Sequence, residues 1–367
     1  MNIGVPKEIK NNEFRVAITP SGVREFIKHG HSVFIETSAG TGSAISDDDY
    51  RKVGATILPN ADDVWAKADL VLKVKEPIAA EFPRMRKGQV LFTYLHLAAS
   101  RECTDALMKS GITAIAYETV EVNGGLPLLA PMSEVAGRMA AQVGAAALQK
   151  SAGGRGVLLG GVPGVRPGRV LVLGGGTAGL AAATIAHGMR ADVTVVDVNQ
   201  RRLSEIDQIF GGTVTTLMSN THEIEEQALE ADLVIGAVLV HGAKAPKLIT
   251  NELVKKMKSG AVLVDIAIDQ GGCFEDSKPT THADPTFKVH DTLFYCVANM
   301  PGAVPFTSTF ALSNATLPYA LALANKGWKE ALQQDASLRK GLNVHDGKIY
   351  YRAVGEAHGL PVSEWTF

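Results

Sequence analysis

Val170-Leu-Val-Leu-Gly-Gly-Gly-Thr-Ala-Gly179 is the stretch of this 367-residue chain that indicates the fold most directly. Its four apolar residues predict a buried strand, and Gly174, Gly176 and Gly179 follow with the spacing G-x-G-x-x-G. In such a turn the first glycine permits the tight bend, the second lets a pyrophosphate approach the backbone, and the third lets the next helix pack closely on the strand. The helix expected over 181–189 would direct its free N–H groups and its positive dipole end at the phosphates. The stretch therefore predicts a dinucleotide-binding turn.

Asp197 closes the next apolar segment, Val193-Thr-Val-Val-Asp197. An acid at about this distance, roughly 20 residues beyond the glycines, ordinarily binds the adenosine ribose, and its charge repels a 2′-phosphate. The pattern therefore favours NAD over NADP. A structural glycine-rich loop is the alternative interpretation, but strand, glycines, helix, second strand and terminal acid all agree with a cofactor site.

The composition is that of a globular protein with more than one domain. A chain of 367 residues is too long for one ordinary core, so two domains are expected. With 46% hydrophobic residues, 20% charged residues and a net charge of −2, the sequence has neither a nucleic-acid footprint nor a polybasic membrane patch. No apolar run approaches the ~20 residues that span a bilayer, and the N-terminal residues contain no signal-peptide core.

The cysteines indicate a reducing environment. Cys103, Cys273 and Cys296 lie far apart in the sequence and are odd in number. They match neither a zinc-binding spacing nor a disulfide framework. We therefore expect no metal site and a cytoplasmic location.

Strand-like apolar segments alternate with helical segments over both halves of the chain. The expected strands are Asn2–Val5, Val33–Glu36, Leu70–Val74, Gln89–Tyr94, Thr113–Tyr117, Arg169–Leu173, Asp192–Asp197, Thr213–Met218, Leu233–Ala237, Ala261–Ile266 and Thr292–Val297. This alternation predicts an α/β fold of two doubly wound domains. An apolar helix at about 308–326 can run back to the first half, so the substrate domain is expected to be discontinuous and flavodoxin-like, over 1–127 and 306–367. A Rossmann NAD-binding domain, 128–305, is inserted in it.

A helix is expected to join the two halves. Ser133 is the predicted N-cap of this helix, which would run over 134–150 and is rich in alanine and glycine. The segment 151–167 that follows is a glycine-rich connector without periodicity.

Charged residues follow three strands of the first half. Arg15 follows the first strand, Lys73 and Lys75 close the strand near residue 74, and His96 follows the next strand. A guanidinium and an ammonium bind carboxylates, and histidine exchanges protons near neutral pH. Together these side chains predict a site for a small keto or amino acid. Each of them alone has a simpler interpretation, as a solvated surface cation or a hydrogen-bonded structural histidine.

The second half carries further polar residues beyond its strands. Asp269 follows the fifth strand and could orient the nicotinamide ribose, the substrate amine or a water molecule, although an acid before two glycines is also typical of a turn. Asp265, still within the strand, is expected to be structural. Ser219 and Val238-Leu239 follow strands three and four, where an adenine ring would lie, and Asn299-Met300 follows strand six near the expected nicotinamide.

The sequence resembles the L-alanine dehydrogenase family over essentially its whole length. The motifs that carry the resemblance are Gly4-Val-Pro-Lys-Glu-Ile-Lys10, Arg15-Val-Ala-Ile-Thr-Pro20, Lys73-Val-Lys75-Glu-Pro77, Thr93-Tyr-Leu-His96, Pro131-Met-Ser-Glu-Val-Ala-Gly137, Gly160-Gly-Val-Pro-Gly164, Leu173-Gly-Gly-Gly-Thr-Ala-Gly179, Asp265-Ile-Ala-Ile-Asp-Gln-Gly-Gly272 and Asn299-Met-Pro-Gly302. Enzymes of this family use NAD to interconvert L-alanine with pyruvate and ammonium. They are usually homohexamers.

The resemblance also implies roles for individual residues. Arg15 and Lys75 would bind the substrate, and His96 and Asp269 would act in catalysis. Besides the fingerprint glycines, the implied NAD contacts are Ser133, Thr177, Ala178, Asp197, Arg202, Ser219, Val238, Leu239, Ile266, Ala267, Ile268, Asp269, Lys278, Val297, Ala298, Asn299 and Met300. Lys278 departs from the family pattern, because an arginine often stands there; the charge is kept but the forked hydrogen bonding is lost.

Three alternatives remain open at this stage. The NAD(H)-binding component of a proton-translocating transhydrogenase is similar in sequence but needs no amino-acid site. A D-2-hydroxy-acid dehydrogenase would need a catalytic Arg, Glu and His set in the cofactor half, where His282 and His290 do not supply that pattern. A saccharopine-type dehydrogenase is separated only by an assay across amino acids.

Overall fold

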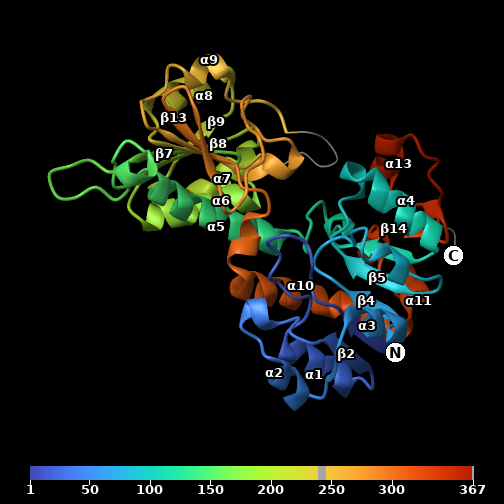
Figure 1. Cartoon of the computed structure of the whole chain (residues 1–367). Coiled ribbons are helices and arrows are strands. Elements are labelled where there is room, and N and C mark those ends of the chain that lie inside the picture. The colour runs from blue at the N-terminus through green and yellow to red at the C-terminus, as the bar shows by residue number, and fades with distance from the viewer. Residues whose placement is uncertain (239–244, 366–367) are drawn as a thin grey trace. The chain divides into compact units, whose positions relative to one another are not determined.

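The computed structural model describes residues 1–238 and 245–365, and the chain divides into two units (Figure 1). Unit 1 contains Met1–Met132 and Val304–Phe367, so the blue beginning and the red end of the chain share one unit. Unit 2 contains Ser133–Ala303. Both units are α/β, which confirms the predicted class.

Unit 1 is built on an eight-stranded sheet with the order β15-β14-β6-β5-β4-β1-β2-β3. The strands β1 to β6 pair in parallel, whereas β14 pairs antiparallel with β6 and β15 pairs antiparallel with β14. Their bounds are Asn2–Val5 (β1), Ser32–Glu36 (β2), Thr56–Leu58 (β3), Leu70–Leu72 (β4), Val90–Thr93 (β5), Thr113–Ala116 (β6), Leu342–His345 (β14) and Lys348–Ile349 (β15). The sequence analysis did not predict β3, β14 and β15, which are short segments of two to four residues.

Side-chain caps fix several helices of unit 1. Ser46 accepts a hydrogen bond from the Asp49 backbone N–H ahead of α2, and Ser100 accepts one from the Cys103 N–H ahead of α4. Gly111 ends α4 in the left-handed conformation, with φ of 69°. The helices are α1 (Pro20–Lys28), α2 (Asp47–Lys52), α3 (Ala61–Lys67), α4 (Arg101–Ser110), α10 (Pro305–Lys326), α11 (Trp328–Gln334), α12 (Ala336–Arg339) and α13 (Arg352–His358).

Unit 2 is built on a seven-stranded sheet with the order β12-β13-β11-β10-β7-β8-β9. Its strands are Arg169–Leu173 (β7), Asp192–Asp197 (β8), Thr215–Met218 (β9), Leu233–Gly236 (β10), Val262–Asp265 (β11), Thr286–Val289 (β12) and Thr292–Tyr295 (β13). Its helices are α5 (Ala130–Ala147), α6 (Thr177–Gly188), α7 (Gln200–Phe210), α8 (Thr221–Glu230) and α9 (Asn251–Val254). The edge strand β12, which pairs antiparallel with β13, was not expected from the sequence.

The helix α5 corrects one local prediction. It begins at Ala130, so Ser133 lies inside its first turns and is not the N-cap. Pro131 explains the difference, because proline is tolerated at the start of a helix, where its missing N–H would have no intrahelical partner. The helix also crosses the boundary between Met132 and Ser133 that separates the two units.

The strand order corrects the expectation that the substrate domain is flavodoxin-like. In chain order the parallel strands of unit 1 are arranged 3-2-1-4-5-6, and those of unit 2 have the same arrangement. A flavodoxin-like sheet would have the order 2-1-3-4-5. Local sequence patterns show that strands and helices alternate, but a crossover can place the next strand on either side of the previous one. In each sheet the direction in which successive strands are added reverses once, between β1 and β4 in unit 1 and between β7 and β10 in unit 2. Right-handed crossovers on the two sides of this reversal place helices on both faces of the sheet, as expected for doubly wound domains.

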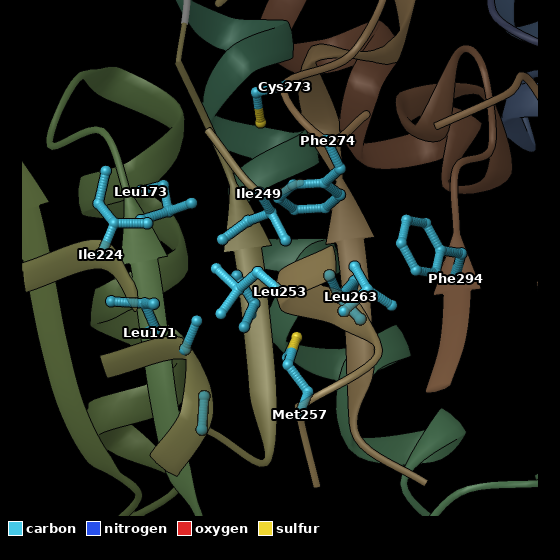
Figure 2. Close-up of a cluster of buried hydrophobic side chains, with 14 of the residues drawn as sticks. Leu171, Leu173, Ile224, Ile249, Leu253, Met257, Leu263, Cys273, Phe274 and Phe294 are labelled. Carbon is cyan, nitrogen blue, oxygen red and sulfur yellow. The ribbon is translucent and has the colours of Figure 1, made fainter. Parts of the chain in front are cut away.

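One hydrophobic cluster of unit 2 lies between its strands and the helices on one face (Figure 2). Leu171 and Leu173 of β7 and Leu263 of β11 point from the sheet into this cluster, where they meet Ile249 and Phe274. All five side chains are buried. Val170 and Val172, which alternate with these leucines along β7, are buried as well, so both faces of the strand are covered.

A buried cluster of charges ties together two strand ends of unit 1. The Lys73 ammonium is 2.9 Å from a Glu8 carboxylate oxygen and 2.8 Å from one of Glu81, and none of the three side chains is more than 3% exposed. Glu8 also accepts a hydrogen bond of 2.6 Å from the Val74 N–H. Burial raises the pKa of Glu8, although the Lys73 charge opposes this. Since Glu8 follows β1 and Lys73 follows β4, the cluster joins the strands where the order reverses.

Replacing Lys73 with methionine is expected to lower the free energy of unfolding by about 3–5 kcal/mol, because two buried carboxylates then lack their cation. Without Lys73, the buried carboxyl groups have a higher pKa in the folded protein than in the unfolded chain. Lowering the pH through that pKa protonates them and stabilises the folded state. The loss should therefore be smaller near pH ~5 than near pH ~8. Urea denaturation at both pH values measures it. Lys87→Met is the control, because the Lys87–Asp346 pair is largely exposed and should contribute ~0–1 kcal/mol. Equal losses in the two variants would contradict the prediction.

Candidate active site

The carboxyl edge of the unit 1 sheet collects the charged residues that the sequence singled out. Arg15, Lys75 and His96 follow β1, β4 and β5, and the strand order reverses between β1 and β4. Ligand sites of doubly wound sheets lie at such a reversal. The charges of Lys75 and His96 both act on Glu76, while the charge of Arg15 acts on Tyr94, which stacks on His96. The structure thus brings the three predicted residues into one region of unit 1.

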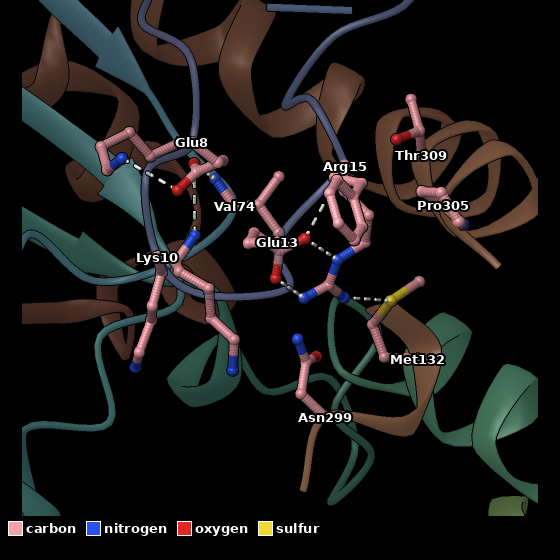
Figure 3. A network of polar contacts seen from close by, with 12 residues as sticks. Glu8, Lys10, Glu13, Arg15, Val74, Met132, Asn299, Pro305 and Thr309 are labelled. Carbon is pink, nitrogen blue, oxygen red and sulfur yellow. Dashed lines mark hydrogen bonds and ion pairs between the residues drawn. The ribbon is translucent and has the colours of Figure 1, made fainter. Parts of the chain in front are cut away.

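Arg15 is held in a buried fork by Glu13 (Figure 3). Its Nε is 2.6 Å and its Nη2 2.5 Å from the two carboxylate oxygens of Glu13, and its Nη1 is 3.0 Å from the Met132 sulfur. Burial alone would lower the pKa of this guanidinium, but the hydrogen bonds and charge of Glu13 outweigh it, so the pKa is raised. The side of Arg15 formed by Nε and Nη2 therefore already binds a carboxylate of the protein. The sequence analysis missed Glu13, although it lies only two residues before Arg15.

The structure separates the roles of the two lysines after β4. Lys73 is fully buried between Glu8 and Glu81, so it is part of the fold. Lys75 is half-buried, and its backbone N–H is 3.4 Å from the Glu8 carboxylate. Glu8 therefore contacts two successive main-chain N–H groups just beyond β4 and fixes the position from which Lys75 extends.

Glu76 is a second residue that the sequence analysis did not single out. One of its carboxylate oxygens pairs with Lys10, and the other is buried without a hydrogen-bond partner among the described residues. Burial would raise the pKa of this carboxyl group. The hydrogen bond from Lys10 and the charges of Lys75, Lys10 and His96 outweigh burial and lower the pKa. Glu76 is therefore an anion next to the cations of the site.

His96 lies at the turn that follows β5, with its side chain exposed. Its backbone is left-handed, with φ of 48° and ψ of 38°. Its imidazole stacks on the ring of Tyr94, with centroids 5.8 Å apart and planes 15° apart. An exposed imidazole that is held in place by stacking on a buried ring can exchange protons with a bound molecule.

The glycine turn of unit 2 has the geometry that a dinucleotide requires. Gly174 has φ of 95°, which residues with a side chain rarely adopt. A Cβ placed on Gly179 would lie 1.7 Å from the carbonyl oxygen of Gly174, so only glycine allows α6 to pack this closely. A Cβ on Gly176 would meet nothing within 4 Å, so the backbone faces open space at the start of α6. These features fit a pyrophosphate on the helix N-terminus.

Asp197 and Arg202 hold the glycine turn from the end of β8. Asp197 accepts hydrogen bonds from the N–H groups of Gly175, at 2.6 Å, and Asn199, at 2.8 Å. The Arg202 Nε donates to the carbonyl oxygen of Gly175 at 2.5 Å. The Ser219 N–H donates to the backbone carbonyl of Asp197. Three of the predicted NAD-binding residues are therefore joined by hydrogen bonds at the carboxyl edge of the unit 2 sheet.

Asp265, the last residue of β11, and Asp269, just beyond it, differ in their surroundings. Asp265 is buried and accepts hydrogen bonds from the Ala267 and Cys273 N–H groups and the Ser277 hydroxyl. Burial raises the pKa of this carboxyl group, and the hydrogen bonds oppose it. Asp265 thus stabilises the turn, as expected for a structural acid. Asp269 lies in the 3₁₀ helix Ile266–Gln270, and its side chain is exposed.

The remaining predicted NAD-binding residues differ in exposure. Ala267, Ile268, Val297 and Met300 are buried, Thr177 and Lys278 are exposed, and Ser133, Ala178, Val238, Ile266, Ala298 and Asn299 are half-buried. Lys278 places its ammonium over the ring of Phe287, 4.5 Å from the centroid. Gly137 of α5, one helical turn after Ser133, packs directly on the Ala178 carbonyl of α6. Leu239 lies outside the described residues.

The described part of the chain contains neither a metal-binding cluster nor a helix that could span a membrane. Within residues 1–238 and 245–365, no group of three or more His, Cys, Asp or Glu side chains is placed to hold a metal ion. Over the same residues, no helix combines the length and the apolar character that crossing a membrane requires. Cys103, Cys273 and Cys296 are all buried free thiols.

Replacing Gly179 with alanine is expected to lower the free energy of unfolding by at least about 1–3 kcal/mol, because the new Cβ collides with the Gly174 carbonyl. Gly188→Ala is the matched control in the same helix, since a Cβ there meets nothing within 4 Å. That variant should be neutral or more stable by ~0.5–1 kcal/mol. Chemical denaturation of both variants measures the difference. Similar stabilities would show that α6 does not pack on the turn as described.

Known proteins match this chain over nearly its full length. Profiles of the alanine dehydrogenase/PNT N-terminal and C-terminal domains match residues 4–136 and 140–352. The chain is 64% identical over 365 residues to the alanine dehydrogenase of Mycolicibacterium smegmatis, covering 99% of this chain and 98% of that protein. It is 57% identical over 367 residues to the alanine dehydrogenase of Geobacillus stearothermophilus, with the same coverage.

Solved structures give the same result. A structure of an L-alanine dehydrogenase matches with a TM-score of 0.95 and 54% identity, covering 98% of this chain and 99% of that one. A transhydrogenase from Sinorhizobium meliloti matches with a TM-score of 0.82 at 24% identity, covering 96% of this chain and 100% of that one, which shows a shared fold alone. The predicted family is confirmed: the chain belongs to the alanine dehydrogenase/PNT family.

Proposed function

We propose that this chain is an NAD-dependent L-alanine dehydrogenase, which converts L-alanine and water to pyruvate and ammonium and also catalyses the reverse reaction. The observation that carries the proposal is the 64% identity to the Mycolicibacterium smegmatis alanine dehydrogenase over 99% of the chain. The residues at the carboxyl edge of unit 1 support it, because two cations and an imidazole suit a small amino or keto acid.

Arg15 and Lys75 are proposed to bind the substrate carboxylate. Glu13 engages Nε and Nη2 of Arg15, and Nη1 lies next to the Met132 sulfur, so the guanidinium is held in one orientation. Lys75 adds a point charge on a flexible stem. Binding through fixed charges orients the Cα–H bond, and such orientation supplies a large part of the rate enhancement in enzymes.

NAD, when bound, would supply the acceptor for the hydride that leaves the substrate Cα as the amine lone pair forms the iminium, the protonated imine. His96 is proposed to accept a proton from the water that attacks the imine carbon and to return it to the departing amine. Asp269 is proposed to orient the water or the amine through its exposed carboxylate. In the reverse direction the same residues assist the addition of ammonia to pyruvate.

The NAD site is proposed to lie on the glycine turn of unit 2. The open face of Gly176 and the start of α6 would hold the pyrophosphate, and Asp197 the adenosine ribose. The negative charge of Asp197 disfavours a 2′-phosphate, so NAD is expected to be used in preference to NADP.

We also infer a homo-oligomer, a hexamer by resemblance to the family, and a cytoplasmic location. The three buried free thiols fit a reducing compartment. Light scattering of the purified protein tests the hexamer, and a stable monomer would contradict it.

The test of the function is the formation of NADH, followed by absorbance, with a panel of L-amino acids and with NAD or NADP. We expect L-alanine with NAD to give the highest kcat/KM. One methylene group changes the discrimination between two substrates by only ~1–3 kcal/mol. We therefore also expect measurable but lower activity with L-serine and L-2-aminobutyrate. Tight NADH binding without activity on any amino acid would instead favour the NAD(H)-binding component of a transhydrogenase.

His96→Ala is expected to lower kcat by about 10²–10⁴-fold, the usual contribution of a general acid–base group. The affinity for NADH, measured by fluorescence titration, should stay unchanged, because the glycine turn does not involve His96. His222→Ala is a control, since that imidazole is exposed and near Glu226 on α8. Near-native turnover of His96→Ala would remove His96 from the mechanism.

A further inference from the structure

The backbone of His96 adopts a conformation that costs free energy. Its φ of 48° lies in the left-handed region, which residues with a Cβ rarely occupy. Such a conformation persists only where surrounding contacts enforce it. The contacts that enforce it here are therefore part of what places the imidazole.

One carboxylate supplies those contacts. Oε1 of Glu118 accepts a hydrogen bond of 2.6 Å from the His96 N–H and one of 3.1 Å from the Leu95 N–H. Oε2 is 3.2 Å from the same Leu95 N–H. Successive N–H groups at a left-handed turn form a concave site for an anion, and here the anion is a side chain of the protein.

The topology explains why Glu118 reaches this turn. Leu95 and His96 follow β5, and Glu118 lies in the 3₁₀ helix Tyr117–Thr119 that follows β6. The two strands are parallel neighbours, with Thr93 paired to Ala116. Both segments therefore leave the sheet at the same edge, one beside the other.

Aromatic packing fixes the imidazole ring of His96, whereas the Glu118 carboxylate fixes its backbone. The His96 imidazole stacks on Tyr94, and the Tyr94 hydroxyl donates a hydrogen bond of 2.5 Å to the Leu128 carbonyl. The ring of Tyr117 packs edge-on against Tyr94, with centroids 5.1 Å apart and planes at 84°. Tyr117 directly precedes Glu118. The ring on which the imidazole stacks and the carboxylate that binds its backbone are therefore held by the same group of packed residues.

We propose that Glu118 is a positioning residue for His96: its carboxylate holds the Leu95 and His96 N–H groups, keeps the turn left-handed and so places the imidazole over Tyr94. This proposal rests on the proposed role of His96. Glu118 acts on the reaction through His96 alone. A residue that only stabilises the turn would affect the enzyme whether or not His96 were present.

A double-mutant cycle separates these two cases. Glu118→Gln keeps the size of the side chain but removes one acceptor and the charge, and it should lower kcat by about 10-fold in the wild-type background. In the His96→Ala background the same change should lower kcat by less than ~2-fold. The KM for pyruvate should not change in either background, because Arg15 and Lys75 are untouched.

Glu121→Gln is the matched control, since Glu121 lies on the same segment and pairs with Lys340. It should leave kcat unchanged. Thermal unfolding checks that all variants fold. If Glu118→Gln does not fold, Glu118→Asp serves instead, because its shorter side chain keeps the charge but cannot reach both N–H groups, and it should give the same pattern.

Equal decreases of kcat in the two backgrounds would overturn the proposal. A crystal structure of Glu118→Gln adds a test that does not depend on activity: we expect His96 to leave the left-handed region or its stack on Tyr94. An unmoved imidazole would overturn the proposal even if turnover had fallen. If His96→Ala kept full activity, the proposed catalytic role would fail, whereas the crystal structure would still decide whether Glu118 positions the turn.

Discussion

Parallel pairing of the strands is the constraint on which the rest of this structure depends. Strands buried on both faces carry mainly apolar side chains, so charged residues gather at the strand ends and in the segments that leave the sheet, and parallel strands send all these segments to one edge. Arg15, Lys75, His96 and Glu118 in unit 1 obey this rule. In unit 2 the glycine turn follows β7 in the same way, and Asp197 is the last residue of β8. The apolar strands determine the fold, and the short segments after them determine the chemistry.

Carboxylates of the protein orient the charged groups of unit 1. Glu13 binds Arg15, and Glu8 contacts both Lys73 and the main chain of Lys75. Buried ion pairs add little net stability, because desolvation offsets the attraction, but they hold a side chain in one geometry. A site that must align a small substrate gains more from fixed geometry than from additional charge.

The sequence predicted the α/β class, most of the parallel strands and the family, because apolar segments and glycine spacing are local patterns. It did not predict the order of the strands, since each crossover has two possible directions. It also missed the partners that fix the site: Glu118 is 22 residues from His96 and Glu8 is 65 residues from Lys73. Such pairs become visible only when the sheet brings the strand ends together. Glu13, two residues before Arg15, could have been recognised as a local pair.

The strand β14 has a consequence for synthesis of the chain on the ribosome. It pairs with β6, yet more than 200 residues, including all of unit 2, separate Ala116 from Leu342. While these residues are translated, β6 is an open edge of an incomplete sheet, and such edges are sites of mispairing and aggregation. Unit 2, whose strands are contiguous in the sequence, can complete its sheet first. The nascent chain thus finishes its inserted half before the half in which it began.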